Sequence, residues 1–349
     1  MRTFASSPTD MAIRLAVRHR VPLIVSISGV SGSGKTYSAL LFAAGLAGSS
    51  GTVGFLDTEN GRGCMYVDSP GIAAALPNKY QYDELVAPFS PARYIAAIDE
   101  FERHGCAVLV IDSGSHEWEG VGSCSDMAAE DKNKWNRAKR EHKKFVQRLL
   151  NSKMHIIVCL RAREKEKIIA KEDSPDGKEK HIPLGIQPVA EKGFVFEMML
   201  SFMVEDGTHF AKPIKVPEQF AKLFREPRLL TKADGEAVRL WNEGGQAEDP
   251  SERLRRQARS AAEEGMARYK AFFEGLAADQ KRSLGAVHEE CKARAAAVDA
   301  SEQASETQDD PRFQFKLEAR GYDSVDDIKP EHRDKVLAEI RAELAGAAQ

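Results

Sequence analysis

The segment GVSGSGKT at positions 29–36 has the residue types and spacing that bind a phosphate chain. Its glycines let the backbone fold so that several N–H groups point inward, and the helix that follows adds the positive end of its dipole. Lys35 is expected to contact the β- and γ-phosphates of ATP, and the Thr36 hydroxyl to bind Mg²⁺. The residues predicted to surround the phosphates are Gly29, Val30, Ser31, Gly32, Ser33, Gly34, Lys35 and Thr36. An accidental match in a glycine-containing turn is the alternative, but the apolar run before the loop and the helix after it argue against that.

A magnesium site beside such a loop also needs a carboxylate at the end of a neighbouring apolar strand. The run AVLVID ends in Asp112, which we predict to complete the metal site together with Thr36. A strand-terminal aspartate also commonly caps a turn. With a phosphate-binding loop in the same chain, the metal role is favoured.

ATP hydrolysis further requires a group that orients or deprotonates the attacking water. Many P-loop ATPases have a glutamate directly after the magnesium-binding aspartate, but Ser113 occupies that position here. The segment FLDTE supplies Glu59 at the tip of the adjacent predicted strand, and Glu117 in HEWEG is a competing candidate. We predict Glu59 as the catalytic carboxylate. HEWEG is not a zinc-protease motif, because Gly120 stands where HExxH has its second histidine.

Short apolar runs that alternate with helical stretches must hold these residues in place. Strands are predicted at 22–28, 52–57, 106–112 and 155–160, and helices at 35–47, 91–104 and 126–150. The strands are apolar almost throughout, which is typical of a parallel sheet covered by helices on both faces. After residue 160, turn segments at DSPDG and at DG predict two antiparallel hairpins. We therefore predict an α/β P-loop NTPase fold with antiparallel additions and a C-terminal helical module.

Composition shifts divide the chain into six predicted segments. They are a basic, helical lead-in (1–21), the ATPase domain (22–242), a polar linker (243–252), a helical module (253–298), an acidic linker (299–311) and a helical tail (312–349).

The overall composition is that of a soluble globular protein. Of 349 residues, 42% are hydrophobic, and the net charge is −3, so any nucleic-acid-binding surface must be a local patch. The five cysteines show no CxxC pair and no metal-ligand spacing, which fits a reducing cytoplasm. No signal peptide or membrane-spanning run is expected, and we predict no membrane partner.

Four segments in this order, GVSGSGKT, FLDTE, LVIDS and HIIVCLRAR, resemble the RecA-like recombinase ATPases. More narrowly, DSGSHEW, the helix with Trp135 and the RAREK segment are similar to AAA-family ATP-binding proteins of phages and prophages. Some of these promote single-strand annealing and recombination. The resemblance covers roughly residues 22–242. It implies a DNA-stimulated ATPase in which Glu59 activates water and Arg161 occupies the γ-phosphate sensor position, where the recombinases typically have glutamine.

The same resemblance implies partners and a location. We expect single-stranded DNA, a homo-oligomeric ring or filament, and a phage recombination or single-strand-binding protein as partners. The expected location is the cytoplasm of a bacterial host cell. Arginine replaces the usual glutamine at position 161, which could allow a direct, finger-like contact with the γ-phosphate and weakens the case for a conventional strand-exchange filament.

A basic helix over residues 132–148 is the predicted nucleic-acid surface, with its basic residues, Arg148 among them, expected on the outer face. The residues expected to contact the phosphate backbone are Lys139, Arg140, Lys143 and Lys144. The alternative is a solvated helix face balanced by acids such as Glu141. Aromatic residues make up only 7% of the chain, so single-strand binding would depend on charge rather than on base stacking.

Two other functions fit a P-loop. A small-molecule or nucleotide kinase is the first, although such enzymes usually carry an arginine-rich lid and lack a strand-tip glutamate such as Glu59. The second is a binding module in which ATP switches a partner surface built by the C-terminal helices.

Overall fold

Eight strands form one mostly parallel sheet in the computed structural model, which describes residues 15–130, 135–169, 180–308, 311–322 and 325–346. The strands are β1 (Ile24–Gly29), β2 (Val53–Asp57), β3 (Gln81–Glu84), β4 (Val108–Asp112), β5 (His155–Ile169), β6 (Lys180–Pro188), β7 (Leu200–Val204) and β8 (Ala211–Lys215). Their order is β3-β2-β4-β5-β1-β7-β8, and β6 pairs with β5 outside this path. Strand β5 therefore lies between β1, which leads into the phosphate-binding loop, and β4, which ends in Asp112.

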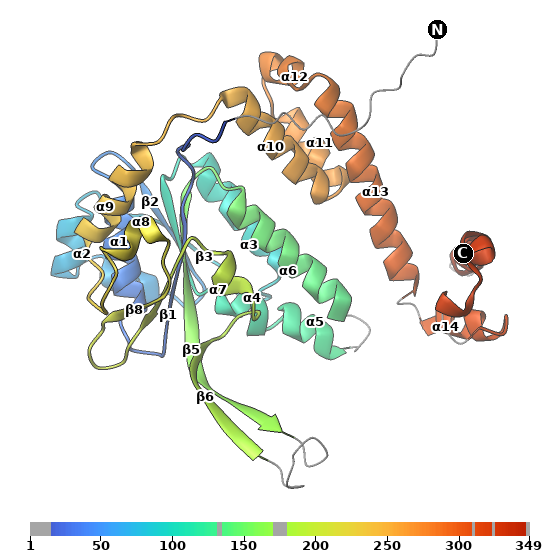
Figure 1. Ribbon diagram of the computed structural model, residues 1–349, viewed down its shortest axis with the longest axis horizontal. Helices are drawn as coiled ribbons and strands as arrows, with labels where there is room; N and C mark the ends of the chain where they lie inside the picture. The colour runs from blue at the N-terminus through green and yellow to red at the C-terminus, as the bar shows by residue number, and fades with distance from the viewer. Residues whose placement is uncertain (1–14, 131–134, 170–179, 309–310, 323–324, 347–349) are drawn as a thin grey trace.

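Helices cover both faces of the sheet (Figure 1). On one face, α1 (Lys35–Ala47) and α9 (Lys232–Glu243) pack over alternate strand residues such as Val25 and Val110. On the other, α3 (Pro91–Arg103) and α6 (Trp135–Leu150) pack over the intervening residues, such as Leu109. Because both faces are buried, each central strand is apolar throughout.

Shorter helices connect these elements. They are η1 (Arg62–Tyr66), α2 (Pro70–Ala75), α4 (Ser115–Glu119), α5 (Cys124–Glu130), α7 (Phe194–Glu197) and α8 (Glu218–Ala221).

Two antiparallel hairpins extend the sheet, as predicted. The second half of β5 leaves the sheet and pairs with β6 as an arm that projects from the body of the domain (Figure 1). Its turn, residues 170–179, lies outside the described residues. Strands β7 and β8 form the other hairpin at one edge of the sheet.

The C-terminal part of the chain is helical and has two small cores of its own. The first is formed by α10 (Pro250–Glu263), α11 (Met266–Glu274), α12 (Ala278–Leu284) and α13 (Ala286–Gln308). It buries Leu254, Tyr269 and Cys291 among others. The second contains α14 (Pro311–Glu318), η4 (Val325–Asp327) and α15 (Pro330–Gly346), and it buries Phe313 and Ile340. The predicted fold class, a mostly parallel α/β sheet with hairpins and a helical C-terminal module, is confirmed.

The predicted acidic linker at 299–311 is wrong for most of its length, because α13 continues to Gln308. This segment is acidic and of low complexity, yet its Ala, Glu and Gln residues are strong helix formers. Low complexity alone therefore did not signal a break in the helix.

The predicted helical lead-in also differs where it is described. Residues 1–14 lie outside the described residues, and the segment from 15 to 21 contains no helix. Instead, His19 forms an isolated bridge with Gln246, and the Arg18 guanidinium lies 4.7 Å from the ring centroid of Trp241. These contacts hold the segment extended against the start of the linker to α10. In the described part of the chain, no helix combines the length and apolar character that crossing a bilayer requires.

Candidate nucleotide-binding and catalytic site

The phosphate-binding loop connects β1 to α1, as predicted. Gly29 ends the strand, and Lys35 and Thr36 open the helix with both side chains largely buried. Gly34 has a φ of +90°, and a Cβ atom there would lie 3.2 Å from Nδ1 of His209, so glycine is required for both conformation and space. The helix start has no side-chain cap and no acidic residue in its first turn. Its N–H groups are therefore left for an anion.

Thr36 and Asp112 meet directly beneath this loop. The Thr36 hydroxyl donates to Asp112 Oδ2 over 2.5 Å, and Asp112 Oδ1 is buried without a hydrogen-bond partner. Burial raises the pKa of Asp112, and the nearby Lys35 ammonium opposes that rise. A buried hydroxyl beside a carboxylate with a free oxygen is a donor set suited to Mg²⁺, which takes oxygen ligands and retains several waters. The residues present therefore fit magnesium bound to a triphosphate.

Glu59 and Arg161, predicted separately, form a two-pronged ion pair. Arg161 Nε donates to Glu59 Oε1 and Arg161 Nη2 donates to Glu59 Oε2, each over 2.7 Å. Burial alone would raise the pKa of Glu59, but the hydrogen bonds and charge of Arg161 outweigh burial and lower it. Lys35 lowers it further, and Glu59 in turn raises the pKa of Asp112. The Glu59 carboxylate thus lies in the field of the phosphate site.

The register of the sheet explains why Arg161 reaches this place. Arg161 pairs with Gly29 in the β1–β5 ladder, so it stands beside the first residue of the loop. Its backbone N–H donates to the Ser115 hydroxyl over 2.9 Å, and its side chain is 47% exposed. In this structure the guanidinium is bound to Glu59 and has an open side toward solvent.

Asp57 and Thr58 fix the turn that carries Glu59, and sequence reasoning missed both. Asp57 Oδ1 accepts from the Glu59 backbone N–H, and Oδ2 accepts from that of Gly63, each over 2.6 Å. The Thr58 backbone N–H donates to the carbonyl of Asp112 over 2.7 Å. The position of Asp57 at a strand end, two residues before Glu59, was the available signal.

His209 is a further residue that the sequence did not reveal. It lies in the turn between β7 and β8, and its Nδ1 is 2.8 Å from the carbonyl oxygen of Ser33, in place to donate. No local pattern marks a histidine that is 176 positions from its partner.

Glu117, the competing candidate, is placed elsewhere. It lies on α4 with its side chain fully buried, where it accepts hydrogen bonds from Cys124 and His142. Glu59 is therefore the carboxylate that shares the field of Lys35 and Asp112, and we retain it as the catalytic candidate.

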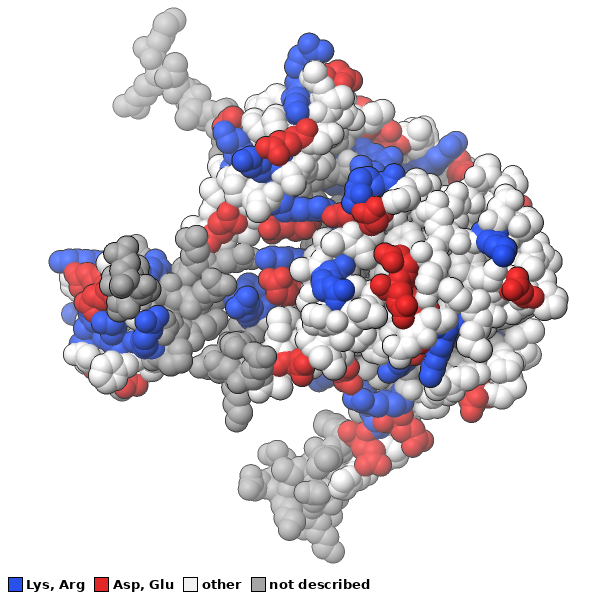
Figure 2. All heavy atoms as spheres, turned by 180° about the vertical axis from the view of Figure 1, so that it is seen from behind, with Lys and Arg blue, Asp and Glu red and all other residues white. Residues whose placement is uncertain are grey.

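The predicted nucleic-acid residues all lie on α6. Lys139 and Lys143 are exposed, whereas Arg140 and Lys144 are partly covered, and Lys144 pairs with Glu141 over 3.1 Å. Figure 2 shows basic and acidic side chains interspersed over the face turned away from the viewer in Figure 1. Any contact with nucleic acid would therefore depend on a local group of lysine and arginine side chains.

One basic residue assigned to this outer face, Arg148, is instead buried. Its Nε lies 2.8 Å from Asp99 Oδ1, and its Nη2 lies 2.5 Å from Glu102 Oε2. It faces α3 because it follows the apolar side of α6, one helical turn after Phe145.

The strand order, the glycine loop and the Thr36–Asp112 pair together define a P-loop NTPase. Residues 22–187 match the profile of a protein family described as "AAA domain", so this part of the chain is similar to the ATPase domains of that family. A structural comparison finds a KaiC-like protein from the hyperthermophilic archaeon Pyrococcus horikoshii OT3. It has 14% sequence identity and a TM-score of 0.32, and the match covers 62% of this chain and 91% of that one. The search of curated proteins gave no match.

Proposed function

We propose that this protein is a magnesium-dependent ATPase. The observation that carries the proposal is the hydrogen bond of Thr36 to Asp112, beneath a helix start that has no cap of its own. In P-loop enzymes such a hydroxyl and carboxylate hold Mg²⁺ against the β- and γ-phosphates, and the lysine neutralises charge on the transferred phosphoryl group. Bound magnesium would supply this charge neutralisation and orient the phosphates.

Glu59 is proposed to orient and deprotonate the attacking water. Both of its oxygens accept hydrogen bonds from Arg161, and each oxygen keeps a second lone pair that can accept from water; opening of the pair is needed to release Arg161. Arg161 is half-exposed and lies beside the loop, and once released it would carry its charge to the γ-phosphate. Opening of the pair would thus supply the arginine contact.

The test of the hydrolytic proposal is Glu59→Gln, with Glu119→Gln as the matched control. Glu119 also pairs with an arginine, Arg163, but lies at the end of α4. Glu59→Gln is expected to lower kcat by about 10²–10⁴-fold while ATP binding persists, because general-base catalysis contributes about that much. Unchanged turnover in Glu59→Gln would reject Glu59 as the base.

We further propose that the protein acts on single-stranded DNA in recombination or annealing and uses ATP hydrolysis to do so. Two observations support this proposal: the resemblance to phage ATP-binding proteins, and the basic side chains on α6, of which Lys139 and Lys143 are exposed. The proposed assembly is a homo-oligomeric ring or filament in the bacterial cytoplasm, working with a phage recombination or single-strand-binding protein. A gel-shift assay should show a complex that salt weakens. Absence of a complex at about 50 mM salt, with and without ATP, would reject the DNA proposal.

A kinase and an ATP-switched binding module remain the alternative proposals. The closed Glu59–Arg161 pair favours the module, because it keeps Arg161 bound to the carboxylate. Tight ATP binding with negligible hydrolysis, even when DNA is present, would support the module. Transfer of phosphate to a nucleoside or metabolite would support the kinase.

A further inference from the structure

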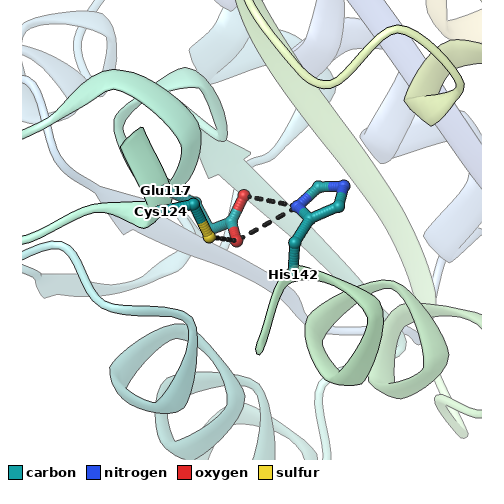
Figure 3. Close-up of side chains that lie close together, drawn as sticks. All are labelled: Glu117, Cys124 and His142. Atoms are coloured by element: carbon teal, nitrogen blue, oxygen red, sulfur yellow. Dashed lines mark hydrogen bonds and ion pairs between the residues drawn. The ribbon is translucent and has the colours of Figure 1, made fainter. Parts of the chain in front are cut away.

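We propose that Glu117, Cys124 and His142 form a buried zinc-binding site, separate from the nucleotide site. The three side chains come from consecutive helices, α4, α5 and α6, and point toward one another (Figure 3). Each offers one ligand atom, and the three atoms all lie within 4.8 Å of one another. Thiolate, imidazole and carboxylate are the ligand types that zinc binds in proteins.

The distances within this cluster, Glu117–Cys124–His142, are close to those around a bound zinc ion. His142 Nδ1 lies 2.9 Å from Glu117 Oε2, and Cys124 Sγ lies 3.1 Å from Glu117 Oε1. With zinc–ligand distances of about 2.0–2.3 Å, tetrahedral ligand atoms lie roughly 3.3–3.7 Å apart. Measured from the single oxygen Glu117 Oε1, His142 Nδ1 lies at 3.2 Å and Cys124 Sγ at 3.1 Å, so these two distances need to lengthen by only about half an ångström to admit zinc. Tetrahedral zinc takes four ligands, and the described residues of this cluster supply three of them.

Burial supplies the second argument. Glu117 is 1% exposed, Cys124 is 0% exposed and His142 is 7% exposed. A buried carboxylate is costly unless a positive charge accompanies it, and a thiol is a weak hydrogen-bond donor. Zinc would provide that charge and bind the thiolate. A protonated His142 is the competing way to satisfy Glu117, and it predicts a hydrogen-bonded cluster without metal.

Aromatic side chains hold the histidine in position. The Trp118 ring meets His142 edge-on with centroids 5.1 Å apart, and the Phe194 ring lies 5.8 Å away. A ligand fixed by its packing loses little freedom on binding metal.

A zinc ion here would join the segment after Asp112 to the basic helix. Helix α4 begins at Ser115, three residues after Asp112, and His142 lies on α6 between the exposed Lys139 and Lys143. The ion would thus connect the magnesium-binding strand end to the surface proposed to bind DNA. It would act without touching ATP.

The test uses the full chain, stripped with a chelator, reloaded with Zn²⁺ or Co²⁺ and then desalted. Wild type should retain one equivalent of Zn²⁺ after desalting, and Co²⁺ in its place should give the near-ultraviolet charge-transfer band of a thiolate ligand. Mg²⁺ at the phosphate site cannot produce that band. Cys124→Ser should lose the band, and His142→Asn should weaken Co²⁺ binding at least about tenfold. The matched control is Cys106→Ser. Cys106 is also a buried cysteine, and its thiol donates a hydrogen bond to Gln81 Oε1.

A second variant keeps the test decisive if Cys124→Ser does not fold. With the other four cysteines, Cys64, Cys106, Cys159 and Cys291, replaced, Cys124 is the one thiol left, and the cobalt band must persist. Absence of retained zinc and of the band in wild type would overturn the proposal and leave a hydrogen-bonded cluster. A band that survives Cys124→Ser would overturn it as well.

Discussion

Arg161 holds both carboxylate oxygens of Glu59, with donor–acceptor distances of 2.7 Å on each side. Glu59 follows the end of β2 and Arg161 lies within β5, and β4 separates these two strands in the sheet. Their pairing links the candidate base to the candidate γ-phosphate contact, so a movement of Arg161 toward the phosphate would change the charge around Glu59. The first prediction concerns this pair.

Replacing Arg161 with Gln should move the acidic limb of the pH–activity profile to higher pH. Burial raises the pKa of Glu59 and Arg161 lowers it, with the net shift downward, so removing the guanidinium leaves burial dominant. In wild type the Glu59 carboxylate stays ionised at pH values below the ordinary pKa of a glutamate. In the variant it becomes protonated at a higher pH than in wild type. The measurement is kcat/KM against pH in both proteins. An acidic limb at the same pH in both would contradict the assignment of Glu59 as the base.

The same pair should contribute a small, pH-dependent stability. The pKa of Glu59 is lower in the folded protein than in the unfolded chain. The ion pair therefore adds to the free energy of unfolding at pH values above the unfolded-state pKa, and this contribution is lost as the pH falls through the folded-state pKa. The guanidinium is 47% exposed, so the loss in Arg161→Gln should not exceed about 1 kcal/mol at neutral pH. Denaturant unfolding at neutral and acidic pH measures it. A difference between the two proteins that grows on acidification would contradict the sign.

Asp112→Asn should stabilise the nucleotide-free protein and disable catalysis. Asp112 is buried with one oxygen unpartnered, and its pKa is raised by burial, so its charge is costly without a metal. Removing that charge should raise the free energy of unfolding by about 1–2 kcal/mol, while Mg²⁺-dependent turnover falls at least about 10²-fold. Thermal melts without nucleotide and ATPase assays with Mg²⁺ test the two parts. A lower melting temperature in the variant would show that Asp112 is not under electrostatic strain.

His209→Ala should weaken ATP binding about fivefold. The imidazole donates to the Ser33 carbonyl over 2.8 Å and packs against Gly34, and a hydrogen bond of this kind contributes about 1 kcal/mol. His209→Asn keeps a donor and should recover part of the loss, and Thr208→Ala in the same turn is the control. Calorimetric titration with ATP measures the affinities. Equal affinity in His209→Ala and wild type would remove His209 from the site.

The sequence predicted what local pattern determines. The apolar runs marked the central strands because both faces of a parallel sheet are buried, and the pairing of Thr36 with Asp112 followed from strand ends that meet at one edge. The Glu59–Arg161 pair could not be predicted, because it depends on the register of β5 against β1 and on a side-chain rotamer.

Contacts between distant elements account for the other omissions. Arg148 was assigned to the outer face of α6, although α3 supplies Asp99 and Glu102 to receive it. Cysteine spacing excluded a local metal motif, whereas the cluster of Glu117, Cys124 and His142 gathers its members from three helices. Such assemblies depend on how helices pack, which single-sequence spacing does not record.

Asp99→Ala should loosen the helical module from the ATPase domain. Asp99 on α3 accepts a hydrogen bond from Arg148 of α6. It also accepts from Nη1 and Nη2 of Arg268 on α11, over 2.6 and 2.9 Å. Arg148 keeps its ion pair with Glu102, but Arg148 and the partly buried Arg268 both lose the hydrogen bonds to Asp99, at a cost of about 1–3 kcal/mol. Glu100→Ala, one residue along the same helix with its side chain 43% exposed, should cost little. Limited proteolysis between α9 and α10, with thermal melts, measures the effect. If the two variants melted and were cleaved alike, Asp99 would not be the contact that fastens α11 to α3 and α6.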